Sequence, residues 1–179
     1  MRSRAFIVAA LLLGGPACAH ALRGASAVSE VHLPRDHAAH DDAQTEWWHW
    51  HGHLADARGR RWDFFLAFVK QHTDLDRVLG IPVRWFVDPF QVAYFSVLDR
   101  EAGRFVVRER HSFPDTWAAD ARTDRLAVRH DGWSARATSP SRMNVVARAG
   151  DLALSLGMRA DKPPARMGRR GFVHVPPES

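Results

Sequence analysis

The sequence is poor in cysteine and in long apolar runs, and both shortages limit what this protein can be. Cys18 is the only cysteine among the 179 residues. The longest apolar run, residues 5–13, has nine residues, whereas a helix that crosses a bilayer needs about 20. We therefore expect no stable membrane span. A mature chain without Cys18 can form no disulfide, so its fold must rest on core burial alone.

The same short apolar run predicts export. Arg2 and Arg4 precede the run, and Ala19-His20-Ala21 follows it with the small-residue pattern of a signal-peptidase cleavage site. We expect a signal peptide over residues 1–21 and cleavage after Ala21. The mature protein is then secreted or periplasmic.

Two alternatives stay open at the end of this segment. Ala17-Cys18-Ala19 offers a second cleavage pattern close to the first. Cys18 could instead carry a lipid, although Gly15-Pro16-Ala17 before it is a poor lipobox. Simple secretion is the favoured interpretation.

The sequence also lacks a clustered stripe of positive charge, although its formal net charge is +5 and its pI is near 10.5. Arg2 and Arg4 would leave with the signal peptide. The other arginines are spread in ones and twos and alternate with apolar residues, as on a solvated strand face. Nucleic-acid binding would need a clustered basic patch, so we expect no nucleic-acid partner.

A convincing helical period is absent as well, apart from a turn or two of helix that residues 115–121 could hold. From residue 46 onward the chain alternates with period two between turn residues, and Asp131-Gly132 is a strong hairpin signal. We predict an all-β, lipocalin-like antiparallel barrel or sandwich over residues 22–161 and a linker-like tail over 162–179. The predicted strands are 46–54, 61–70, 90–98, 104–111, 126–130, 133–138, 143–148 and 152–158.

Six of the eleven histidines lie between His32 and His53. On the first predicted strand, alternation places Trp47, His49, His51 and His53 on one face and Glu46, Trp48, Trp50, Gly52 and Leu54 on the other. Three histidines in such a row could converge on zinc, and His37 and His40 form a second possible pair. A solvent-facing histidine row explains the pattern equally simply, so we favour no metal and predict no cofactor.

Glu46 is the first candidate for chemistry, because it stands beside Trp47 and Trp48. A carboxyl group among large rings must be paired or its pKa rises. Such a group could act as a general acid, with tryptophan faces to shelter a cation. The favoured alternative is a structural polar network at the start of the barrel, with His37, His40 or nearby arginines as partners. Asp36 is the second candidate acid.

These elements together resemble the secreted lipocalin-like proteins grouped with carotenoid 1,2-hydratase, the CrtC/AttH family. The resemblance rests on residues 33–40, Glu46-Trp47-Trp48, Gly52-His53-Leu54, Gly59-Arg60, Lys162-Pro163-Pro164, Gly168 and Gly171-Phe172. It implies two lipocalin-like domains in full-length relatives, of which this chain would be the first. If active, such a chain would be a hydratase or a hydrolase-like enzyme that acts on an apolar substrate.

Two departures from the family pattern bear on function. The family usually has Tyr and Thr at the places of His49 and His51, so the resemblance implies no metal site there. The motifs of the second half, where the hydratase's proposed acid lies, are absent from this sequence. The chain therefore resembles a fragment, a truncated product or a stand-alone first half, which makes catalysis by it alone uncertain.

The predicted partner is an apolar small molecule of isoprenoid or lipid type, which small β-barrels can hold in their mouth or interior. The candidate binding residues are Trp47, Trp48, His37, His40, Trp62 and Phe64. Phe65, Phe68, Trp85, Phe86, Phe90, Tyr94 and Phe95 supply further aromatic surface, although most of these rings would serve equally well as core. An inactive remnant is the remaining alternative.

Overall fold

The computed structural model describes residues 31–73, 77–82, 89–112 and 119–165. Within them the chain is nearly all β-strand, because the apolar residues recur with period two and turn residues separate the runs. The elements are η1 (Arg35–His37), β1 (Thr45–Ala55), β2 (Arg61–Gln71), β3 (Arg77–Val78), β4 (Ile81–Pro82), β5 (Phe90–Asp99), β6 (Arg104–Ser112), β7 (Ala119–Ala121), β8 (Ala127–His130), β9 (Trp133–Ser139), β10 (Arg142–Ala149) and β11 (Leu152–Arg159).

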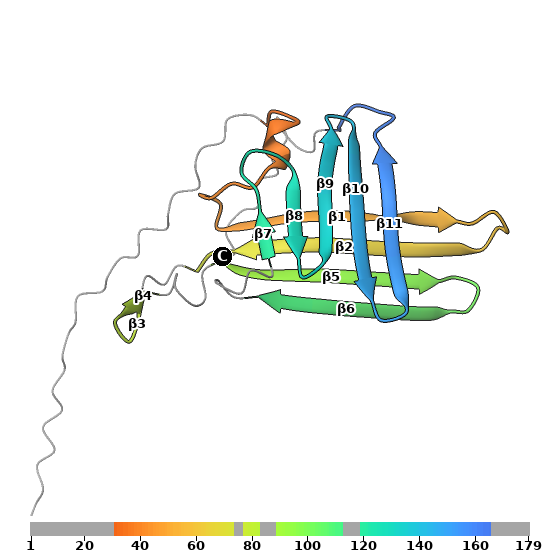
Figure 1. Ribbon diagram of the computed structural model, residues 1–179, viewed down its shortest axis with the longest axis horizontal. Helices are drawn as coiled ribbons and strands as arrows, with labels where there is room; N and C mark the ends of the chain where they lie inside the picture. The colour runs from red at the N-terminus through yellow and green to blue at the C-terminus, as the bar shows by residue number, and fades with distance from the viewer. Residues whose placement is uncertain (1–30, 74–76, 83–88, 113–118, 166–179) are drawn as a thin grey trace, which may run out of the picture.

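The strands form two antiparallel sheets that lie face to face with their strands crossing (Figure 1). The first sheet has the order β1-β2-β5-β6, and the second has the order β11-β10-β9-β8-β7. A separate two-stranded hairpin, β3-β4, lies apart from both. Among the described residues no ladder joins the two large sheets, so the fold is a lipocalin-like sandwich rather than a closed barrel.

Short turns connect the neighbouring strands and set their register. Asp131 and Gly132, the two residues between β8 and β9, have φ values of 46° and 84°. Positive φ at both positions is what a type I′ turn requires, and that turn matches the twist of paired strands. Between β1 and β2, Asp56 Oδ1 accepts hydrogen bonds from the backbone N–H groups of Arg58 at 2.8 Å and Arg60 at 3.0 Å.

One hydrophobic core fills the space between the sheets. Leu66, Phe95 and Trp133 are its largest fully buried apolar side chains, and the rings of Phe95 and Trp133 meet edge to face at 5.7 Å. Trp133 Nε1 donates to the Arg148 carbonyl at 2.7 Å, which satisfies its only polar atom. The rest of the core comprises Phe64, Phe68, Ala93, Val128, Ala135, Val145, Ala147, Ala149 and Leu154.

The all-β, lipocalin-like prediction is confirmed, and one local prediction is wrong. Ala119–Ala121, placed in a possible helical turn, is strand β7 and pairs with β8. The ladder to β8 pairs the backbone N–H and C=O groups of β7. This pairing outweighs the weak local preference of the segment for helix. Several predicted features lie outside the described residues. They are the signal peptide at residues 1–21 with Cys18, residues 115–118 of the possible helical turn, Trp85, Phe86 and residues 166–179 of the tail. No helix within the described part is long and apolar enough to cross a membrane.

Candidate functional site

The Glu46 carboxylate ties the incoming chain to the first sheet. Its two oxygens each lie 2.9 Å from the His40 backbone N–H, and Oε1 lies 2.6 Å from His40 Nδ1. Oε2 lies 3.1 Å from Lys70 Nζ on β2. Partners from this chain therefore surround the carboxylate, which is the arrangement of a structural network.

Lys70 is the residue of this cluster that sequence reasoning missed. It is only 4% exposed, and Nζ also donates to the His40 carbonyl at 3.0 Å. Asp41 Oδ1 lies 3.6 Å from the same ammonium group. The register of the β1–β2 hairpin places Lys70 directly opposite Glu46. Counting outward from the turn at residues 56–60 would have paired these two residues.

His37 and Asp36 both lie in η1, the short turn of helix that precedes β1, and both form hydrogen bonds that hold this segment in place. Trp48 Nε1 donates to the His37 carbonyl at 3.0 Å, so His37 contributes its backbone to the cluster. Asp36 accepts from Arg35 Nε at 2.7 Å and from the His32 backbone N–H at 2.6 Å. The hydrogen bond from Arg35, followed by that from His32, lowers the pKa of Asp36. A carboxyl group held in its charged form is a poor general acid.

The predicted aromatic ligands do not form one group. Phe64 belongs to the buried core, and its ring lies against Gly52, where a Cβ would come within 3.3 Å of Phe64 Cε1. Trp48 is half-buried on the inner face of β1, while its neighbour Trp47 is 64% exposed on the opposite face. Trp62 is half-buried, with the Arg60 guanidinium 5.1 Å above its ring.

The inner faces of β1 and β11 carry apolar side chains that the core covers only in part. Trp50 packs edge to face on Phe68 at 6.2 Å, and its Nε1 lies 3.0 Å from Met143 Sδ. Met143 is paired with Met158 of β11. Both strands are edges of their sheets, so among the described residues no further strand extends either sheet beyond them. On β1 and β11 the half-buried apolar side chains that pack against the core are Trp48, Trp50, Leu54, Leu152, Leu156 and Met158.

The histidine row lies on the outer face of β1 and does not converge on one point. The rings of His49 and His51 stack at 5.6 Å between centroids. Their ring planes are nearly parallel, 9° apart, so the nitrogen lone pairs, which lie in those planes, do not point at one zinc ion. His53 Nδ1 instead lies 2.5 Å from Asp63 Oδ1. Within the described residues, no group of three or more His, Cys, Asp or Glu is placed to hold a metal ion.

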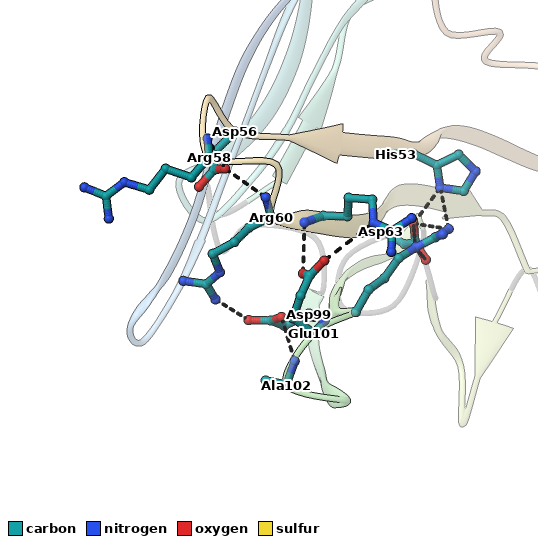
Figure 2. Close-up of polar contacts among 10 residues, drawn as sticks. His53, Asp56, Arg58, Arg60, Asp63, Asp99, Glu101 and Ala102 are labelled. Carbon is teal, nitrogen blue, oxygen red and sulfur yellow. Dashed lines mark hydrogen bonds and ion pairs between the residues drawn. The ribbon is translucent and has the colours of Figure 1, made fainter.

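A second polar network joins the β1–β2 and β5–β6 turns at the far end of the first sheet (Figure 2). Asp63 accepts two bonds from Arg100 Nε at 2.9 Å, and Arg60 Nη2 donates to Asp99 Oδ2 at 2.7 Å. Arg100 and then His53 lower the pKa of Asp63. These pairs are exposed, so each stabilises the fold only slightly. Their effect is to hold the two turns together.

Comparison with known proteins now adds the family. The sequence profile of the AttH-like family matches residues 25–179. The chain belongs to the AttH-like family. Among solved structures, the AttH-like chain is similar to the crystal structure of a protein from Nitrosomonas europaea described as an AttH. The TM-score is 0.69, the identity is 20%, and the match covers 83% of this chain and 43% of that one. No curated protein matches the AttH-like chain.

The comparison fixes the fold more firmly than the activity. At 20% identity the likeness to the Nitrosomonas protein shows the fold alone, and this AttH-like chain spans less than half of that protein's length. The family membership agrees with the segments around Glu46-Trp47-Trp48 and Gly52-His53-Leu54 that first indicated it. The relation to carotenoid hydration stays a prediction.

Proposed function

We propose that this AttH-like chain is an exported protein that binds an apolar small molecule of isoprenoid or lipid type. The observation that carries the proposal is the half-covered apolar side, that is, the half-buried side chains on the inner faces of the edge strands β1 and β11. Large side chains that point inward yet keep part of their surface in water lose that exposure when an apolar ligand lies against them.

The chemistry of this side suits a flexible apolar chain. Trp50 offers a broad ring that packs edge to face on Phe68. Met143 and Met158 add flexible, unbranched thioether side chains beside it. Methionine adapts to ligands of differing shape, and indole contributes large contact area. Leu66, Phe95 and Trp133 already fill the centre of the sandwich, which favours binding at this side.

Binding is a better account of these residues than catalysis by this chain. Hydration of a C=C bond needs a carboxylic acid that can give up a proton to carbon. Glu46 is paired with Lys70 and His40, and Arg35 holds Asp36 in its charged form. We therefore assign the chain no hydratase step.

The binding proposal is tested by titrating the purified chain with a long-chain isoprenoid alcohol and following tryptophan fluorescence. We expect saturable quenching, and we expect Met158→Gln to weaken binding about tenfold by removing apolar contact. Val146→Gln on the outward face of β10 is the matched control and should bind as the parent does. A folded parent chain without quenching would contradict the proposal, as would equal losses in both variants.

Export is tested separately by intact-mass measurement of the protein recovered from the periplasm or medium of an expressing bacterium. Cleavage after Ala21 gives a chain that begins at Leu22 and contains no cysteine. A mass that includes residues 1–21, or a lipid on Cys18, would contradict this part of the proposal.

A further inference from the structure

The face of the first sheet that points away from the second sheet carries apolar side chains on each of its four strands. We call it the outer face. The ladder registers place its side chains in four rows across β1, β2, β5 and β6. The rows are His53-Asp63-Leu98-Phe105, His51-Phe65-Ser96-Val107, His49-Ala67-Tyr94-Glu109 and Trp47-Val69-Val92-His111.

The outer face exposes more apolar surface than a solvated sheet needs. Of the eight large hydrophobic side chains that are exposed among the described residues, four lie on it: Trp47 at 64%, Phe105 at 63%, Val107 at 51% and Phe65 at 37%. Single exposed apolar residues are ordinary, but a contiguous patch rimmed by polar groups marks an interaction surface. The rim here is the histidine row on β1 and Glu109 with His111 on β6.

At its centre the outer face can complement itself in side-chain size. A two-fold axis parallel to the strands would lay β2 of one copy over β5 of the other, row by row. Phe65 would then lie opposite Ser96 of the partner subunit, and Ala67 opposite the partner's Tyr94. In these two pairs a large side chain meets a small one, which is how two sheet faces interdigitate at about 10 Å separation.

The charges select this axis over the perpendicular one. With the axis along the strands, β1 lies over β6 of the second copy, and His49 lies opposite the partner's Glu109. With the axis across the strands, β1 lies over β1, and the histidines meet histidines. Within its own chain Glu109 Oε1 already lies 2.8 Å from His111 Nε2. The same carboxylate can therefore attract the imidazole of the partner's His49.

We propose that the outer face is the contact surface of a two-fold symmetric homodimer, in which β1 of each copy lies over β6 of the other. The exposed apolar side chains of the outer face supply the association energy, and the His49–Glu109 pairs at the rim set the orientation. The surface is distinct from the half-covered apolar side, so the dimer does not depend on the proposed ligand.

Sedimentation equilibrium of the full chain at micromolar concentration tests the association. We expect a dimer, and we expect Val107→Lys to raise the dissociation constant at least about a hundredfold because it buries a charge in the contact surface. Val146→Lys on the outward face of β10, exposed by 38%, is the matched control and should leave the dimer intact. Far-UV circular dichroism confirms that both variants are folded.

A charge exchange tests the orientation. Glu109→Lys alone and His49→Glu alone should each weaken the dimer about tenfold, and the two together should restore it. Within one chain β2 and β5 separate these residues by about 14 Å, so restoration reports a contact between copies. A parent chain that stays monomeric at about 100 µM overturns the proposal. If the parent is a dimer but the double exchange does not restore the association, the proposed orientation of the two copies is wrong.

Discussion

At the scale of single residues, the buried pair of Lys70 and Glu46 holds the start of the domain in place. Both side chains are almost removed from solvent, and the His40 backbone completes their contacts. A charge that loses its partner in such a place is left without compensation, and that loss costs far more than the intact pair contributes. The pair therefore has a large effect on stability when only one member is removed.

We predict that Lys70→Met lowers the free energy of unfolding by about 3 kcal/mol, because Glu46 then loses its counter-charge. Lys162→Met, the same change at an exposed lysine, should leave stability within about 0.5 kcal/mol of the parent. The measurement is urea unfolding followed by circular dichroism. Adding Glu46→Gln to Lys70→Met should recover part of the loss, and strictly additive losses would contradict the pairing.

At the scale of elements, the hairpin turns are where the sequence was most informative. The eight longer strands were predicted within a few residues, because alternation and turn residues recur together in them. The two-residue strands β3 and β4 were missed, since two residues cannot show a period. The division of β1 into two faces also followed from alternation, and the structure places Glu46 and Trp48 inside and Trp47 outside.

The candidate site was harder to predict, because its partners come from different strands. His40 was expected beside Glu46 and lies there, whereas Lys70 depended on the register of the β1–β2 hairpin. Trp47 and Trp48 were both predicted to bind the ligand, although alternation places adjacent strand residues on opposite faces. The half-covered apolar side depends on how the two sheets stack, which no local pattern encodes.

The turn between β8 and β9 gives a prediction at this scale. Gly132 has a φ of 84°, where a side chain is strained, so Gly132→Ala should cost about 1–2 kcal/mol. Gly157→Ala is the matched control: its φ is ordinary, and a Cβ would lie 3.6 Å from Asn144 Oδ1, a normal contact. Urea midpoints of the two variants decide the matter. If Gly157→Ala is the more damaging change, the turn does not limit this hairpin.

At the scale of the whole molecule, one buried imidazole links the stability of the fold to pH. His130, at the end of β8, is 2% exposed, and neither ring nitrogen makes a hydrogen bond among the described residues. Burial lowers the pKa of His130 from 6.5, and it outweighs the Gln91 backbone and the charge of Asp131, which act in the opposite direction. In the unfolded chain the ring takes up its proton at the ordinary pKa, so acid favours unfolding.

We therefore predict that the parent chain loses stability as pH falls through 6.5 toward the lower folded pKa, while His130→Leu loses less. Above the unfolded pKa the ring is neutral in both states, and the contribution of this group no longer changes with pH. Unfolding free energies of both proteins between about pH 8 and pH 5 provide the measurement, in the range where histidine titrates. Parallel curves for the two proteins would show that another group dominates.

Each of the two large sheets is built from one continuous part of the chain, and the first sheet's part precedes the second's. This order in the sequence has a consequence for the order of assembly. Every ladder of the first sheet closes by Ser112, before Ala119 begins the second sheet. During synthesis or after translocation, the first sheet can therefore pair completely while the side meant for the core is still bare. Such an intermediate has apolar surface on both faces, and unshielded surface of this kind promotes aggregation. The first half of the fold is therefore the stage at which a chaperone would have most to protect.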